Sequence, residues 1–154
     1  MMSLCCDVIH TLRGKTLVTA ESLTGGGIGA ALTSVSGASA VYKGGIISYT
    51  NAVKHKLLGV PTDILDQYGA VSAPVAKAMA EGALKVLEAD VAVSVTGLAG
   101  PSGDEYGNPV GTVYIGYSDS KTTIVKHCLF SGDRDSIRNQ TIEAALQLVL
   151  SMQK

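Results

Sequence analysis

Two hydroxyl side chains followed by three glycines form the most chemically suggestive segment of the chain, Thr19–Gly27. A short apolar run precedes the segment and a helical pattern follows it, so the order predicts a strand, a turn and a helix. Glycine lets a backbone approach a ligand closely, and free N–H groups at a helix start favour an anion. Ser22 or Thr24 would therefore lie at the mouth of an oxyanion or phosphate site.

The same two hydroxyls have a purely structural interpretation, because a Ser or Thr before a helix often caps its free N–H groups. Glycines at a helix start cost stability, however, and three in succession indicate that another group must approach closely. The alternative to capping is a nucleophilic hydroxyl at this turn, with the N–H groups of Thr24–Gly27 holding the oxyanion, and the residues alone leave both interpretations open.

A second candidate segment, Tyr49–Lys56, also follows a predicted strand and leads into a predicted helix. Sites in open α/β sheets form beyond the carboxyl ends of strands, so the two turns are expected to converge. Lys54 and Lys56 are candidate bases for a serine, because a lysine in a dry pocket loses its proton more readily. A solvated helix face is the alternative for both lysines, and His55 is a further candidate that suits the surface. Spacing alone does not choose among these three side chains.

Two later segments follow predicted strands in the same way. Thr96, Gly97 and Gly100 can line a phosphate or ribose, and the length of their loop favours a functional role. Before the last predicted helix, Asp133 has an ordinary capping role. Arg134 opposes the helix dipole in the first turn, which suits a residue that meets a phosphate or carboxylate.

Alternating helical and strand patterns have to position these four segments. The predicted helices are 2–13, 26–35, 51–58 capped by Asn51, 62–68, 72–88 capped by Ser72, and a last helix capped by Asp133. The predicted strands are 15–20, 41–49, 91–95, 110–118 and 122–130. This order predicts an α/β fold with helices on both faces of a mixed, mostly parallel sheet of about five strands. The hairpin of the last two strands requires at least one antiparallel strand.

Bulk composition narrows the class of protein. The 154 residues, 46% of them hydrophobic, suffice for one domain over 1–154 with a single core. A net charge of −1 argues against a nucleic-acid or anionic-membrane partner. Cys5, Cys6 and Cys128 lack a metal-ligand spacing and indicate reduced thiols in a cytoplasmic protein. No signal peptide and no membrane-spanning stretch is expected.

Taken together and in this order, the segments resemble the CinA C-terminal domain family, over nearly the whole chain from about residue 17. The matching motifs are Glu21-Ser22-x-Thr24-Gly25-Gly26, Gly44-Gly45-x-x-Ser48-Tyr49-Thr50-Asn51-x-x-Lys54, Thr96-Gly97-x-Ala99-Gly100-Pro101, Pro109-Val110-Gly111-Thr112-Val113 and Phe130-Ser131-Gly132-Asp133-Arg134-Asp135. Leu23 stands where many members have cysteine, which removes no candidate catalytic group.

The resemblance implies a stand-alone nicotinamide-nucleotide amidohydrolase, which converts nicotinamide mononucleotide and water to nicotinate mononucleotide and ammonia. It also implies a three-layer α/β/α sandwich with neither metal nor cofactor. The motif serine, the proposed nucleophile, corresponds to Ser22, the motif lysine corresponds to Lys54, and Tyr49 matches a further site position. Substrate contacts are expected from Thr24, Gly25, Gly26, Asn51, Thr96, Gly97, Gly100 and Arg134.

Two other functions are consistent with the same residues. The fold can serve as a non-catalytic nucleotide-binding module, in which the glycine turns hold a phosphate and Ser22 only caps a helix. It can also be a Ser-Lys hydrolase that acts on another carboxamide. In each case the expected partner is a small molecule, and a homodimer or higher homo-oligomer is the commonest assembly for such enzymes.

Overall fold

The computed structural model describes every residue, Met1–Lys154. It contains five strands, six α-helices and one short 3-10 helix. In chain order the elements are α1 (Met2–Thr11), β1 (Leu17–Glu21), α2 (Gly27–Thr33), η1 (Ala38–Ala40), β2 (Tyr42–Ile47), α3 (Asn51–Leu58), α4 (Thr62–Tyr68), α5 (Ala73–Val86), β3 (Val91–Gly97), β4 (Thr112–Asp119), β5 (Thr123–Leu129) and α6 (Arg134–Ser151).

The strands form one mixed sheet in the order β2-β1-β3-β4-β5. β1 pairs in parallel with β2 and β3, whereas β4 pairs antiparallel with β3 and β5. Four of the five strands therefore run in one direction and β4 alone runs against them. This confirms the predicted mixed sheet of five strands. The β4–β5 turn is held by Asp119, whose Oδ1 accepts the N–H groups of Lys121 and Thr122 at 2.8 and 2.9 Å.

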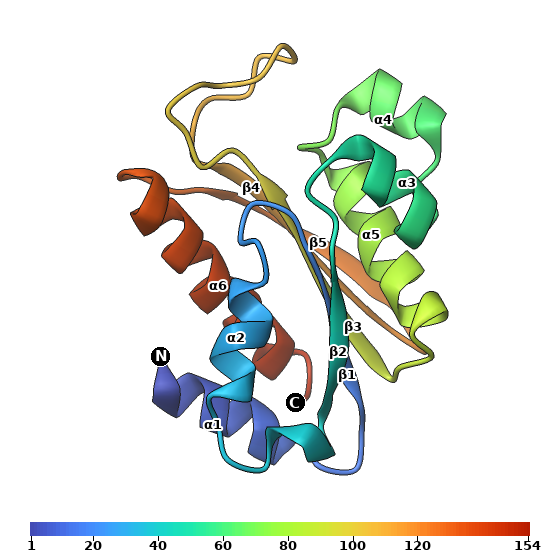
Figure 1. The fold of residues 1–154 in the computed structure, drawn as a ribbon, viewed down its shortest axis with the longest axis vertical. Helices are drawn as coiled ribbons and strands as arrows, with labels where there is room; N and C mark the ends of the chain where they lie inside the picture. Colours follow the sequence, from blue (N-terminus) through green and yellow to red (C-terminus); the bar gives the residue numbers. More distant parts are fainter.

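Helices cover both faces of the sheet, which confirms the predicted three layers (Figure 1). α1, α2 and α6 lie on one face, and α3, α4 and α5 lie on the other. Side chains of β1 alternate between the two cores, with Leu17 in the cluster under α1, α2 and α6 and Val18 in the cluster under α5. All five residues of β1 are buried, as expected for a central strand with both faces covered.

α3 and α5 cross in direct contact at Gly82. A Cβ atom at this position would lie 1.9 Å from the carbonyl oxygen of Leu58, the last residue of α3. Only glycine permits this separation, because a methyl group there would overlap the backbone. The contact packs the end of α3 closely against α5, and Lys54 and Leu58, one helical turn apart, are the buried residues of α3.

Two predicted helix caps differ in detail from the structure. Thr50, not Asn51, is the N-cap of α3, because its backbone is extended and its Oγ1 accepts the N–H of Val53 at 3.4 Å. Ser72 occupies the predicted N-cap position of α5, but its hydroxyl donates to the carbonyl of Gly69 at 2.9 Å and does not cap the helix.

No helix is both long and apolar enough to cross a membrane.

Candidate active site

The backbone around Ser22 is held at the carboxyl ends of three parallel strands. Ser22 directly follows β1, and its N–H donates to the carbonyl of Val95 in β3 at 3.1 Å. On the other side, the N–H of Ser48 after β2 donates to the carbonyl of Glu21 at 2.7 Å. The ladder thus continues past the regular strands and positions Ser22 rigidly.

The side chains of Ser22 and Lys54 meet. Nζ of Lys54 lies 2.9 Å from Oγ of Ser22, although the two residues are 32 positions apart. The same nitrogen donates to the carbonyl oxygens of Ser48 and Tyr49 at 2.8 and 3.2 Å. Lys54 is only 1% exposed and all three of these acceptors are uncharged oxygens. Burial in these surroundings lowers the pKa of Lys54 to about 8, because the ammonium form loses its hydration.

This geometry suits a neutral amine. A neutral lysine has two N–H groups and one lone pair, whereas the ammonium form has three N–H groups. The carbonyls of Ser48 and Tyr49 take up two N–H groups, which leaves the third tetrahedral position of Nζ toward Ser22. In the neutral form that position holds the lone pair, so the amine can accept the proton of the Ser22 hydroxyl.

The carboxylate of Glu21 occupies the start of α2. Its Oε1 accepts the hydroxyl of Thr24 at 2.6 Å and the N–H of Ile28 at 2.8 Å, and its Oε2 accepts the N–H of Gly29 at 3.0 Å. Glu21 is 2% exposed. The expectation that these helix N–H groups receive a ligand anion is therefore wrong, because an internal carboxylate already binds them. The hydroxyl of Thr24 is engaged by the same carboxylate.

Replacing Glu21 with glutamine is expected to lower the free energy of unfolding by about 2 kcal/mol, the usual magnitude for a lost hydrogen bond to a charged group. The amide nitrogen of glutamine cannot accept an N–H, so a buried donor at the start of α2 loses its partner. Urea denaturation would measure the change, with Glu143→Gln on the exposed face of α6 as control. Equal stability of the Glu21 and Glu143 variants would contradict the capping role.

The turn after Ser22 retains several free N–H groups. Gly25 and Gly27 donate theirs within the turn, to the carbonyls of Ser22 and Thr24 at 3.1 and 3.0 Å. The N–H groups of Thr24 and Gly26 have no acceptor in the protein, and neither does that of Leu23. Of the predicted oxyanion donors in Thr24–Gly27, two are thus consumed and two remain. Gly26 has a φ of 101°, which only glycine adopts readily.

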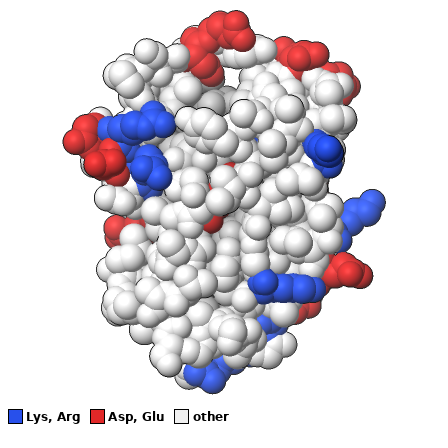
Figure 2. All heavy atoms as spheres, in the orientation of Figure 1, with Lys and Arg blue, Asp and Glu red and all other residues white.

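Arg134 joins three of the predicted segments. Its Nη1 donates to the carbonyl of Gly100 and its Nη2 donates to the hydroxyl of Tyr49 at 3.3 Å. Tyr49, which is 60% exposed, therefore contributes at two places, because its carbonyl accepts from Lys54 while its hydroxyl accepts from Arg134. Figure 2 shows the Lys and Arg side chains of this face in separate places, without a single basic patch.

The remaining predicted substrate residues surround the 98–111 loop. The hydroxyl of Thr96 donates to the carbonyl of Ala70 at 2.7 Å, so it is engaged within the protein. Gly97 ends β3, and a Cβ atom there would lie 2.8 Å from the carbonyl oxygen of Thr112. Asn51 is exposed at the start of α3 and lines a small pocket of about 290 Å³.

The loop itself is tied to the helices beside it. The hydroxyl of Tyr106 donates to the carbonyl of Asp66 in α4 at 2.9 Å, and Nδ2 of Asn108 donates to the carbonyl of Val71 at 3.2 Å. In Figure 1 the loop rises above the end of the sheet where Ser22 lies. It forms one wall of the small pocket that Asn51 lines.

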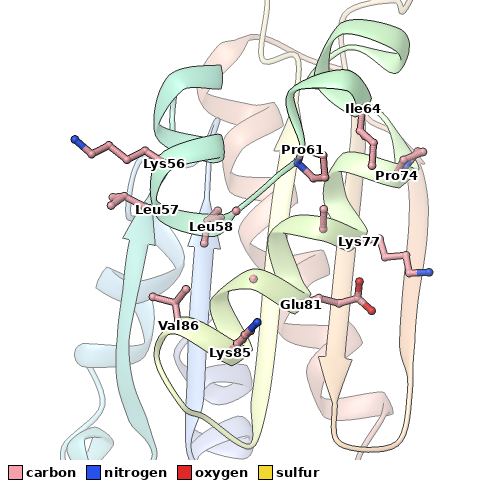
Figure 3. Close-up of a pocket in the computed structure, with 13 residues that line it drawn as sticks. Lys56, Leu57, Leu58, Pro61, Ile64, Pro74, Lys77, Glu81, Lys85 and Val86 are labelled. Carbon is pink, nitrogen blue, oxygen red and sulfur yellow. The ribbon is translucent and has the colours of Figure 1, made fainter.

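The other two candidate bases lie away from Ser22. Nδ1 of His55 is 2.8 Å from the carbonyl oxygen of Val60, within its own helix-to-loop connection. Lys56 is exposed and lines a groove of about 880 Å³ on the outer surface of α3, α4 and α5 (Figure 3). Figure 3 shows its side chain extending outward from α3. Only Lys54 of the three reaches the serine.

Sequence reasoning assigned no role to two side chains of this site. Glu21 was part of the first motif but its capping of α2 was not foreseen. Arg138 was missed altogether, although it lies one helical turn beyond Arg134 on the same helix. Its Nε donates to the carbonyl of Leu23 at 2.9 Å and its Nη2 to that of Thr24 at 3.2 Å. The only available signal was this spacing of four residues.

The fold and the site together define the class of this protein. It is a three-layer α/β/α sandwich with a buried serine–lysine pair beyond the ends of its parallel strands. The sequence model of the CinA C-terminal domain family matches residues 4–153. The chain therefore belongs to this family.

Several relatives document the similarity. Nicotinamide-nucleotide amidohydrolase PncC of Escherichia coli (strain K12) is 45% identical over 136 residues, which cover 88% of this chain and 82% of that protein. A CinA-like protein of Geobacter sulfurreducens is 49% identical over 134 residues, which cover 87% of this chain. The matched part is only 32% of that longer protein, so this chain spans about a third of such relatives.

Solved structures show the same fold. The competence/damage inducible protein CihA from Agrobacterium tumefaciens has a TM-score of 0.96 and 37% identity, covering 99% of this chain and 95% of that one. The competence damage-inducible protein A (ComA) from Klebsiella pneumoniae has a TM-score of 0.95 and 34% identity, with coverages of 97% and 94%.

Proposed function

We propose that this chain is an amidohydrolase that converts nicotinamide mononucleotide and water to nicotinate mononucleotide and ammonia. The observation that carries the proposal is the 2.9 Å contact between Nζ of buried Lys54 and Oγ of Ser22. The choice of substrate rests on the 45% identity to the Escherichia coli amidohydrolase.

The proposed reaction begins with neutral Lys54, which takes the proton of Ser22 while the serine oxygen bonds to the carboxamide carbon. Negative charge then develops on the amide oxygen, and the free N–H groups of Thr24 and Gly26 are the available donors. The pyridine ring of the mononucleotide is positively charged, which makes the amide carbon more electrophilic.

The second half of the reaction releases ammonia and restores the serine. Lys54, now an ammonium, gives its proton to the departing nitrogen as the C–N bond breaks. Lys54 then takes a proton from water, whose oxygen attacks the ester carbon of the acyl-enzyme. Collapse of that intermediate breaks the bond to Ser22, whose oxygen takes the proton back from Lys54, and frees the nicotinic acid group, which ionises to the carboxylate by losing its proton to water.

The substrate phosphate requires a partner other than the start of α2, where Glu21 is already bound. We propose Arg134, which is exposed at the start of α6 beside Tyr49 and Gly100. Its guanidinium can exchange these uncharged acceptors for the phosphate oxygens, which form stronger charge-assisted hydrogen bonds.

An ammonia-release assay on purified protein tests the proposal directly. Turnover of nicotinamide mononucleotide with nicotinate mononucleotide as the second product would support it. Calorimetric binding of the mononucleotide without turnover would favour the non-catalytic binding module. Turnover of another compound in a panel of carboxamides, but not of the mononucleotide, would favour a Ser-Lys hydrolase of different specificity.

The kcat/KM for this reaction is expected to rise with pH, with a midpoint at about 8, the pKa of Lys54. Only the neutral amine can accept the serine proton, and at pH 7 it makes up about a tenth of the population. Below the midpoint the rate should fall about tenfold per pH unit. Measurements from pH 7 to 9.5 avoid the second ionisation of the substrate phosphate, near 6. A flat profile over this range would contradict Lys54 as the base.

A further inference from the structure

Arg138, on α6 beside α2, holds the turn that follows Ser22. From α6 its guanidinium spans two successive carbonyl oxygens, those of Leu23 at 2.9 Å and Thr24 at 3.2 Å. The side chain is half-buried, and these acceptors are backbone carbonyls rather than carboxylates. Such a forked contact matches the planar guanidinium and cannot be reproduced by the single point charge of lysine.

The contact acts on the same peptide group that provides a free donor. The carbonyl oxygen of Leu23 and the N–H of Thr24 belong to one planar, resonance-coupled unit. A cation bound to the oxygen draws electron density from the nitrogen, which makes the N–H at the other end a stronger donor. The N–H of Thr24, two residues after Ser22, has no acceptor in the protein.

Thr24 is restrained from two sides by opposite charges. The carboxylate of Glu21 accepts the hydroxyl of Thr24 at 2.6 Å, and the guanidinium of Arg138 donates to the carbonyl of Thr24 at 3.2 Å. Gly25 follows with a φ of +60°, and a Cβ atom there would lie 3.6 Å from Nη2 of Arg138. The orientation of the Thr24 peptide is therefore set before any substrate binds, which is the condition for efficient stabilisation of developing charge.

We propose that Arg138 is a positioning residue for amide hydrolysis, which orients and polarises the Leu23–Thr24 peptide so that the Thr24 N–H binds the oxyanion. The inference rests on the proposed function. It assigns Arg138 a role different from that of Arg134, which faces the substrate mouth. Because the oxyanion exists only in the transition state and the intermediate, the contribution of Arg138 belongs to kcat and not to substrate binding.

The test compares Arg138→Met and Arg138→Lys with the wild type in the ammonia assay on nicotinamide mononucleotide. We expect kcat to fall about 100-fold in Arg138→Met, the usual loss for one oxyanion donor. KM should change less than about threefold, because ground-state contacts are retained. Arg138→Lys should lose about tenfold, since it keeps the charge without the fork. Arg13→Met, an exposed charge deletion on the α1 side, should match the wild type.

A binding measurement distinguishes the proposed positioning role of Arg138 from a purely structural contact between α6 and the turn. In a Ser22→Ala background, calorimetry measures the affinity for the mononucleotide without turnover. Adding Arg138→Met should leave the Kd within about twofold, because the oxyanion is absent from the bound substrate. Urea denaturation of each variant establishes that the assayed protein is folded. If Arg138→Met does not fold, the kcat and Kd of Arg138→Lys decide in the same way.

The outcomes distinguish this inference from the proposed function. An unchanged kcat in the Arg138 variants, or a loss confined to KM and Kd, would overturn the role of Arg138 while the amidohydrolase assignment stands. A wild type that releases no ammonia from the mononucleotide would overturn both. A lower kcat with unchanged Kd and an unchanged pH midpoint near 8 is the expected result.

Discussion

Replacing Ser22 with alanine is expected to reduce ammonia release from nicotinamide mononucleotide by at least about 10⁴-fold, as removal of a serine nucleophile does in other hydrolases. The variant loses the only oxygen that Lys54 contacts outside the backbone. Residual activity would come from the remaining oxyanion donors and from substrate binding alone. Steady-state kinetics with a coupled ammonia assay would measure the loss.

The fold of the Ser22→Ala variant should remain intact. The N–H of Ser22 still donates to Val95, so the backbone position does not depend on the hydroxyl. Ser94→Ala is a matched control, because Ser94 is a buried serine whose hydroxyl donates to the carbonyl of Ala76 at 2.6 Å, away from Lys54. We expect that variant to lose about 1 kcal/mol of stability and to keep its activity. Wild-type turnover by Ser22→Ala would exclude the serine mechanism.

Replacing Lys54 with methionine is expected to abolish turnover and to stabilise the protein near neutral pH. Methionine has a similar length but no proton-accepting atom, so Ser22 has no base and the rate should fall at least about 10³-fold. The stability gain follows from the buried charge. A pKa lowered from 10.5 to about 8 means that keeping Lys54 charged at pH 7 costs about 3 kcal/mol of folding free energy.

The sign of this effect depends on pH. Between pH 8 and 10.5 the unfolded chain binds more protons at Lys54 than the folded protein does, so wild-type stability rises with pH through this window. In the methionine variant this rise is absent. The carbonyls of Ser48 and Tyr49 lose their donor there, which offsets the gain by roughly 1 kcal/mol each. We therefore expect the variant to be about 1 kcal/mol more stable at pH 7 and the wild type to be more stable at pH 10.

Urea denaturation of both proteins at pH 7, 8.5 and 10 would measure this crossing. Lys56→Met, at an exposed position on the same helix, serves as control and should follow the wild type at each pH. A difference between wild type and Lys54→Met that does not change with pH would contradict the lowered pKa. The combination of lost activity and gained stability would distinguish a functional lysine from a structural one.

The secondary structure could be predicted largely from local patterns. α3 and α4 have the predicted bounds, Asn51–Leu58 and Thr62–Tyr68, because an apolar period and a terminal glycine are properties of adjacent residues. The end of β3 could not be read in this way. The strand was predicted to stop at Val95, but Thr96 and Gly97 pair with Tyr114 and Val113 of β4, and a local pattern does not reveal its pairing partner.

The candidate site was predicted in its residues but not in its contacts. The sequence by itself determined that hydroxyls and glycines follow a buried strand at Ser22, and that two lysines and a histidine follow the next strand. Residue spacing left Lys54, His55 and Lys56 equivalent as bases, and only the resemblance to a family favoured Lys54. The choice depends on which side of α3 is buried against the rest of the protein, and that side carries Lys54 and Leu58, one helical turn apart.

Only the tertiary structure decided how the charges around the serine turn are arranged. Glu21 caps α2 through its own side chain, so the N–H groups of Ile28 and Gly29 in the first turn of that helix are not free for a ligand. Arg138 reaches Leu23 across 115 residues of sequence, because α6 packs beside α2 on the same face of the sheet. Local sequence determines the secondary elements and the chemical groups that they carry, since both depend on neighbouring residues. Which of those groups meet depends on the packing of distant elements, and a single sequence does not encode that packing in any local pattern.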